Sequence, residues 1–188
     1  MADPGLMAEW AAAYRVRLLA AAGALCGDRV EAEDLLQETF SEAMASLARF
    51  EGRSAPYTWL YGILRRRFLL HCRRRRRFLR WAAAAGRLPA SESIAEPSMA
   101  VDAAGEAARD PRLEAVAKAL RTLSVKHREI LHLRYVEGRK IAEIAALVSA
   151  SEGTVKSRLH HALRRVKSAI GRDENGSLVA AREKIHEL

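Results

Sequence analysis

Arginine is the residue with the clearest chemistry in this chain of 188 residues, because eight arginines fall within the thirteen positions 65–77. A guanidinium keeps its charge at physiological pH and presents donors for bidentate hydrogen bonds, so its typical partners are phosphates and carboxylates. A cluster this dense must face an anion or water. Lipid head groups, RNA and DNA all supply such anions, and the tract alone does not choose among them.

A second basic segment, EGTVKSRLHHALRRVK at 152–167, has the pattern of a helix with one buried stripe. The stripe consists of Val155, Leu159, Ala162, Leu163 and Val166. The other faces carry side chains that can neutralise phosphates or reach base edges in a DNA groove, namely Thr154, Lys156, Ser157, Arg158, His161 and Arg165. The alternative is a surface helix of an ordinary bundle whose cationic side is only solvated.

No enzyme or metal motif accompanies these basic segments. The sequence has no HExxH, no phosphate-binding GxxxxGK[ST] loop, no GxSxG and no CxxC. The adjacent pairs His71-Cys72 and His160-His161 diverge by about 100° on a helix, which is a poor start for a metal site. We therefore expect no catalytic residues, no metal and no cofactor.

The overall charge agrees with an anionic partner. The chain has a net charge of +9 and a pI near 10.1, which points to nucleic acid or an anionic membrane. The charge is uneven: residues 1–81 carry 14 basic and 9 acidic side chains, residues 82–111 carry 2 and 5, and residues 112–170 carry 13 and 5. Two basic blocks on either side of an acidic spacer suggest two contact modules on a tether.

The elements that position these residues are predicted to be helices throughout. Apolar residues at three- to four-residue spacing predict helices over about 7–26, 31–48, 59–81, 112–122, 125–136, 140–148 and 152–170, and no segment alternates with period two. We expect Ser54 or Thr58 to cap the third helix, Ser124 the fifth and Ser151 the last. With two cysteines and no run of roughly 18 apolar residues, we expect a protein of the reducing cytoplasm.

The domain organisation follows from the loss of this periodicity. Residues 86–111 are rich in Pro, Ser, Gly and acids, which predicts a flexible linker. We therefore expect an all-α protein with one small domain at 1–85, a second at 112–170 and a C-terminal tail at 171–188. In that tail Leu178, Ile185 and Leu188 are expected to dock against the protein.

The last two helices have the layout of a helix-turn-helix motif. A short helix with the small Ala145 is followed by a tight turn at Ser149-Ala150 and by the basic helix. In this motif the second helix enters the major groove of DNA. DNA is therefore the anion that this domain is expected to bind.

Three motifs in this order resemble a bacterial RNA polymerase sigma factor of the extracytoplasmic-function (ECF) type. They are AEDLLQETF at 32–40, GRSAPYTWLYGIL at 52–64, and LRYVEGRKIAEIA followed by EGTVKSRLHHALRRV within 133–166. The resemblance covers residues 7–170. It implies a non-enzymatic transcription initiation factor that binds core RNA polymerase, recognises promoter DNA and helps to open the minus-ten element, with an anti-sigma protein as a further partner.

The resemblance also assigns roles to individual residues. Asp34, Gln37 and Glu38 would contact core polymerase. The minus-ten contacts would come from Arg53, Ser54, Tyr57, Arg65, Arg66 and Arg73. The minus-thirty-five contacts would come from Thr154, Lys156, Ser157, Arg158, His161 and Arg165. No direct membrane insertion and no small-molecule substrate are implied.

The sequence departs from the family pattern at several positions. Arg66 and Leu70 stand where the family often has Asn and Asp, so contacts of this helix are expected to be mostly electrostatic. Ser149 replaces the usual glycine of the turn. Two other interpretations remain: a free-standing helix-turn-helix repressor or activator, and a basic protein that binds RNA or a membrane surface through residues 65–81.

Overall fold

The structure is a computed structural model that describes residues 4–85 and 111–170, and in these residues it contains helices and no strands. The expected all-α fold is confirmed. The helices are α1 (Pro4–Cys26), α2 (Arg29–Ser46), η1 (Leu47–Arg49), α3 (Pro56–Ala84), α4 (Pro111–Arg121), α5 (Val125–Leu131), η2 (His132–Val136), α6 (Ile141–Val148) and α7 (Glu152–Ile170). The predicted linker at 86–111, except for Pro111, and the predicted docking of the tail lie outside the described residues.

The starts of α2 and α3 show how local chemistry sets the helix boundaries. The Oδ1 atom of Asp28 accepts a 2.8 Å hydrogen bond from the N–H of Glu31, so α2 begins two residues earlier than predicted. The prediction that Ser54 or Thr58 caps α3 is wrong. Pro56 occupies the first turn, where its fixed φ and missing N–H are no disadvantage, and the cap residue is Ala55.

The N-terminal half packs α1 and α2 against the first half of α3. Its core includes fully buried leucines from all three helices, such as Leu18, Leu36 and Leu64. At one end of this core Trp10 lies edge-on to Phe50 and to Trp59, with ring centroids 5.0 and 6.1 Å apart. Trp59 is therefore part of the packing that fixes the loop before α3.

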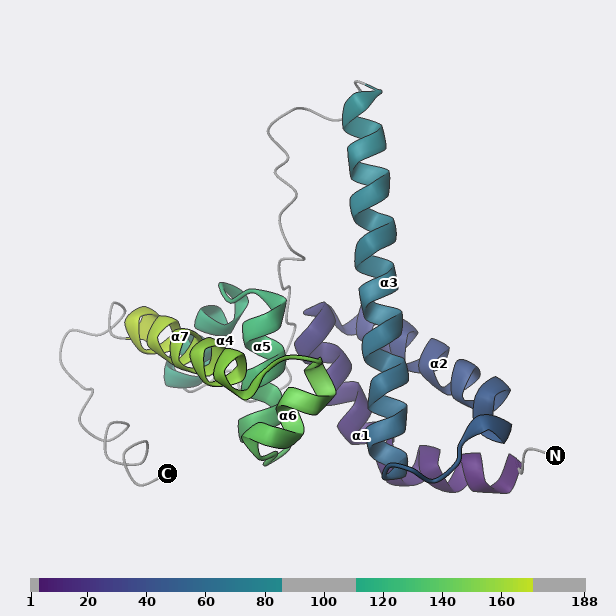
Figure 1. Cartoon of the computed structure of the whole chain (residues 1–188). Coiled ribbons are helices and arrows are strands. Elements are labelled where there is room, and N and C mark those ends of the chain that lie inside the picture. The colour runs from purple at the N-terminus through teal and green to yellow at the C-terminus, as the bar shows by residue number, and fades with distance from the viewer. Residues whose placement is uncertain (1–3, 86–110, 171–188) are drawn as a thin grey trace.

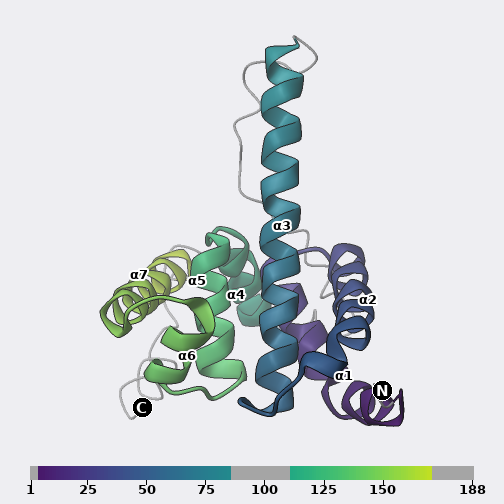
Figure 2. The ribbon, with the colours of Figure 1, turned by 45° about the vertical axis from the view of Figure 1, so that its right-hand side comes forward.

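The second half of α3 projects beyond the other helices (Figures 1 and 2). This part contains Arg73–Arg77, all exposed, together with Phe78 and Trp81, which are 61% and 53% exposed. Most of the arginine tract is therefore carried on a single helix that stands away from the body of the protein.

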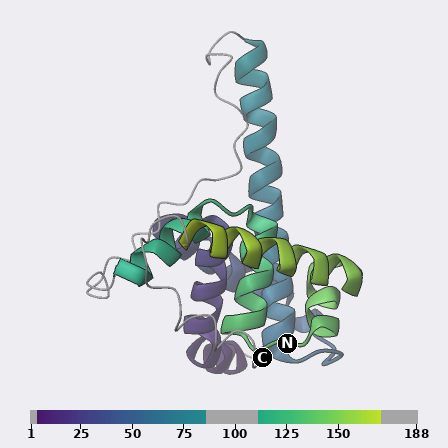
Figure 3. The same cartoon turned by 90° about the vertical axis from the view of Figure 1, so that its left-hand side faces the viewer.

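The C-terminal half is formed by α4–α7, and α7 packs against α4, α5 and α6. Figure 3 shows α7 lying across the direction of α3. The predicted fifth helix is an α-helix only to Leu131 and continues as one π-helical turn, η2. Ser124 stands at the N-cap of α5 as predicted, but its hydroxyl contacts His127 Nδ1 at 2.9 Å instead of a backbone N–H.

The two halves pack against each other. Contacts join α1 to α5 and to η2, and one continuous cluster of buried residues contains Leu25 and Phe68 from the first half and Val148 from the second. The residues that the sequence assigns to two separate modules are thus brought into one body.

Candidate nucleic-acid interface

The helix-turn-helix at α6 and α7 has the local geometry that its sequence predicts. Ser149 adopts a left-handed conformation with φ 52° and ψ 53°, and the N–H of Ala150 donates to the carbonyl of Ala145 at 3.0 Å. Ser151 then caps α7, because its hydroxyl accepts the N–H of Thr154 at 3.2 Å. The turn is therefore fixed by one hydrogen bond to the end of α6 and one to the start of α7.

The residues assigned to the minus-thirty-five element lie on α7, five of them on one face and Lys156 on the other side of the buried stripe. Val155 and Ala162 are buried and anchor the helix. Four of the six assigned residues are exposed and two, Thr154 and Arg158, are half-buried; the exposed ones are Lys156, Ser157, His161 and Arg165. Lys156 pairs with Glu152 at 4.0 Å on the exposed surface, and such a pair is too weak to hold the lysine away from a phosphate.

The minus-ten residues at and after the loop before α3 differ in exposure. Arg53 and Ser54 are exposed, and Arg53 pairs with Glu51 at 2.5 Å on the surface. Tyr57 is instead 3% exposed, and its hydroxyl donates to Glu137 Oε1 of the other half at 2.6 Å. Tyr57 is thus covered by the C-terminal half in this arrangement.

The three arginines assigned to α3 also differ in their surroundings. Arg65 is half-buried, and it donates to Glu129 Oε1 at 2.7 Å and to the carbonyl of Val148 at 3.1 Å. Arg66 is exposed and pairs with Glu42 of α2. Arg73 is exposed on the projecting part of α3. Only Arg65 is engaged by the C-terminal half.

The residues assigned to polymerase contact lie on α2. Asp34 and Gln37 are exposed, whereas Glu38 is half-buried and lies 3.2 Å from Arg67 and 2.9 Å from His71 of α3. Val30 and Met44, 68% and 41% exposed, continue the stripe of Asp34 and Gln37 at helical spacing. Val30 and Met44 are thus exposed apolar side chains on the same face of α2 as Asp34 and Gln37.

Sequence reasoning missed the carboxylates that join the two halves. Glu129 of α5 accepts from the Tyr61 hydroxyl at 3.1 Å as well as from Arg65. Glu137, which follows η2, accepts from Tyr57 and pairs with Arg17 of α1. Both glutamates belong to a basic domain and their partners lie 64 to 120 positions away, so no local pattern indicates them.

The electrostatics of Glu137 follow from these neighbours. Burial raises the pKa of its carboxyl, but the adjacent His132, Tyr57 and Arg17 outweigh burial and lower the pKa to about 2. Burial, the hydrogen bond to Glu137 and its charge raise the pKa of Tyr57 above the ordinary value. The pair is therefore a carboxylate and a neutral phenol over the whole physiological range.

Arg128 adds a third contact between the halves. The side chain is buried, and it donates to the carbonyls of Ala24 and Leu25 in the last turn of α1, at 3.1 and 3.3 Å. Its other terminal nitrogen donates to the carbonyl of Leu123 at 2.7 Å. A cation at the C-terminus of a helix satisfies otherwise unpaired carbonyls and interacts favourably with the helix dipole.

Among the described residues no three His, Cys, Asp or Glu side chains are grouped as metal ligands. Within the same part of the chain, no helix has the length and apolar character needed to cross a membrane.

Known proteins match this chain in both halves. The Sigma-70 region 2 family matches residues 10–78, and the Sigma-70 region 4 family matches residues 113–166. The ECF RNA polymerase sigma factor SigL of Mycobacterium tuberculosis is 32% identical over 144 residues, which are 76% of this chain and 76% of SigL. SigX of Bacillus subtilis is 27% identical over 73% of this chain and 69% of its own.

Solved structures agree. The sigma factor RpoE of Bartonella quintana, in complex with the anti-sigma factor NepR, has a TM-score of 0.68 and 28% identity, and the match covers 88% of this chain and 97% of that one. CnrH, in complex with the cytosolic domain of CnrY, has a TM-score of 0.61 over 92% of both chains and at 21% identity supports the fold. The chain therefore belongs to the bacterial RNA polymerase sigma factors of the ECF type.

Proposed function

We propose that this protein is a transcription initiation factor that binds core RNA polymerase, directs it to specific promoters and helps to open the minus-ten element. The observation that carries the proposal is that one chain holds an exposed basic recognition helix, α7, and a separate basic helix, α3, in segments that match sigma-70 regions 4 and 2. The factor itself performs no catalysis, because RNA synthesis belongs to the polymerase, and it works in the cytoplasm, where polymerase and DNA are.

The proposed division of labour follows the two halves. Residues 1–85 would serve core polymerase and the minus-ten element, residues 112–170 the minus-thirty-five element, and residues 86–111 would link them. Each module alone needs only modest affinity, because tethering both to one polymerase raises the effective concentration of the second contact. Arg165 would bind phosphates of the minus-thirty-five element, and Thr154, Ser157, Arg158 and His161 lie on the same face of α7 at helical spacing. Lys156 lies on the other side of the buried stripe and would contact the DNA backbone beside that face.

The minus-ten residues divide into available and covered ones. Arg53, Ser54, Arg66 and Arg73 are exposed and available to DNA. Tyr57 and Arg65 are held by Glu137 and Glu129, so their use on DNA requires that the halves separate. We therefore propose that the described arrangement is the closed form of the factor and that the polymerase-bound form is open.

The polymerase contact is proposed for the exposed stripe of α2. Asp34 and Gln37 form its polar centre, flanked by Val30 and Met44, and Glu38 at its edge is shared with α3. A further proposed partner is an anti-sigma protein, since the solved relative RpoE was crystallised in complex with the anti-sigma factor NepR.

The test is binding of the full chain to a pool of genomic promoter fragments, with and without sigma-free bacterial core polymerase, at two salt concentrations. Retention and opening of specific fragments only in the presence of core would support the proposal. Selection of a palindromic site by the protein alone would instead identify a free-standing regulator. Equal binding to all fragments that salt abolishes would reduce the arginine tract to an electrostatic patch and overturn the proposal.

A further inference from the structure

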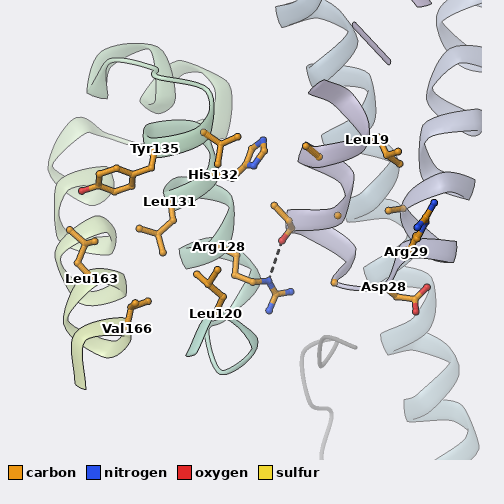
Figure 4. Close-up of a pocket in the computed structure, with 16 residues that line it drawn as sticks. Leu19, Asp28, Arg29, Leu120, Arg128, Leu131, His132, Tyr135, Leu163 and Val166 are labelled. Atoms are coloured by element: carbon orange, nitrogen blue, oxygen red, sulfur yellow. Dashed lines mark hydrogen bonds between the residues drawn. The ribbon is translucent and has the colours of Figure 1, made fainter. Parts of the chain in front are cut away.

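An apolar groove of about 550 Å³ runs along the junction of the two halves (Figure 4). On the wall formed by the N-terminal half, Leu19 of α1 lines the groove. The opposite wall is formed by α4, α5 and α7 and is lined by Leu120, Leu131, Leu163 and Val166. The charged Asp28, Arg29 and Arg128 also border the groove. An apolar lining with charged residues at its border suits an amphipathic helix with a narrow apolar face.

Two apolar side chains of η2 are exposed to solvent at this groove. Tyr135 and Val136 line it and are 52% and 69% exposed. Two large apolar side chains next to an open apolar groove form a contiguous patch, which in soluble proteins marks a contact with another segment or another protein.

The end of the described chain lies close to this patch. Val166 lines the groove one turn before Ile170, the last residue of α7, and 18 residues of the same chain follow. The first seven, GRDENGS at 171–177, are polar and include two glycines. Seven residues span up to about 23 Å when extended, which is enough to return along a groove that α7 itself borders.

The remaining segment, LVAAREKIHEL at 178–188, has the complementary pattern. Leu178, Ala181, Ile185 and Leu188 follow one another at spacings of three, four and three, which places them within an arc of about 80° on a helix. The charged residues of the segment fall outside this arc. As a helix, these eleven residues would be about 16 Å long.

We propose that residues 178–188 of this chain occupy the groove, with Leu178, Ala181, Ile185 and Leu188 against its apolar lining. Bound there, the segment contacts both halves and stabilises the closed form from within the same chain. The linker at 86–110 is the less suitable occupant, because Pro89 and Pro97 fall among its large apolar residues Leu88, Ile94, Met99 and Val101 and disfavour one continuous helix. The inference concerns the groove and the tail and does not depend on the proposed activity in transcription.

Hydrogen–deuterium exchange of the full chain tests this assignment. The comparison includes wild type, Val136→Glu in the groove, Leu178→Glu with Ile185→Glu in the tail, and Phe78→Glu as a control on the exposed part of α3. Val136 and Phe78 are exposed, so both variants are expected to fold, and circular dichroism verifies this. We expect the amides of 178–188 to exchange about tenfold more slowly in wild type and in Phe78→Glu than in the other two variants.

Three results would overturn the assignment. Equal exchange of the tail in wild type and in Val136→Glu would show that the tail does not use this groove. Protection of residues 131–136 that persists in Leu178→Glu with Ile185→Glu would identify another occupant, such as the linker. Protection that rises over a tenfold range of protein concentration, together with a dimer mass by light scattering, would identify a second copy of the chain.

Discussion

The closed arrangement predicts that two conservative substitutions open the protein. Glu129 accepts hydrogen bonds from Tyr61 and Arg65, and Glu137 accepts them from Tyr57 and Arg17. Glu129→Gln and Glu137→Gln keep the size of these two side chains and remove their charge. Both carboxylates are almost fully buried, with 6% and 2% of the side chain exposed, so solvent does little to screen them.

The size of the effect follows from the number of hydrogen bonds. One hydrogen bond to a charged group contributes about 1.5–3 kcal/mol, and glutamine retains one acceptor oxygen of the two, so each substitution should weaken the closed form by about 1–2 kcal/mol. The two glutamates have different donors, so their effects should be nearly additive, about 2–4 kcal/mol. The ratio of closed to open protein then falls by roughly 30- to 1000-fold.

Small-angle X-ray scattering of the full chain measures this directly, as an increase in the radius of gyration of the double variant. Binding of a promoter fragment in the presence of core polymerase gives a second readout. The apparent affinity for DNA is proportional to the fraction of protein that is open. The double variant should therefore bind the fragment more tightly, by up to the same factor.

The control must lose the same two charges without touching Glu129, Glu137 or their donors. Glu9→Gln with Glu33→Gln does so, because both side chains lie in helices of the N-terminal half and Glu33 pairs with Arg29 of its own helix. The reasoning would be refuted if the double variant scattered like wild type, or if the control gained as much DNA affinity as the double variant.

Further predictions concern single positions. Lys156→Ala should weaken promoter binding by a similar factor on all sequences and lower the salt slope by about one, with core affinity unchanged in a pull-down assay; loss of core binding would contradict the assignment of α7. Asp34→Ala with Gln37→Ala should reduce affinity for core by about tenfold in a titration, and unchanged affinity would remove the polymerase contact from α2. Ser149→Gly should stabilise the protein by about 0.5–1 kcal/mol in urea unfolding, because φ 52° favours glycine, whereas Ser149→Ala should bring no gain. Since the pKa of Glu137 is lowered from 4.5 to about 2, its contribution to stability is complete above pH 4.5 and is lost as the pH falls towards 2; Glu137→Gln should abolish this part of the acid dependence of unfolding.

The parts of the fold that the sequence predicts are those fixed by neighbours along the chain. The turn at Ser149, the cap at Ser151 and the buried stripe of α7 all depend on contacts within about four residues. The start of α3 was misplaced because a proline in the first turn makes a side-chain cap unnecessary.

The junction of the halves could not be predicted in this way. Tyr57 and Arg65 are assigned to DNA by the family resemblance, and their partners Glu137 and Glu129 are 80 and 64 residues distant, so no local pattern indicates these contacts. The partner Glu137 looks like an ordinary residue before a glycine turn. Its burial arises from the packing of η2 on α1, and the spacing of apolar residues within either half does not indicate that packing.

In the free protein, repulsion between arginines disfavours helix formation in the projecting part of α3. Arg73, Arg76, Arg77 and Arg80 include pairs three and four positions apart, and each like-charge pair of this kind disfavours a helix by about 0.2–0.5 kcal/mol. Neighbouring helices, which could offset this repulsion by packing, do not reach that part (Figure 1). Counterions must offset the repulsion instead, and the phosphates of DNA supply a high density of negative charge. The helix content of this segment is then itself a reporter of its partner: ellipticity at 222 nm should rise on addition of salt and rise further on addition of DNA, so that ordering the end of α3 becomes part of the act of binding.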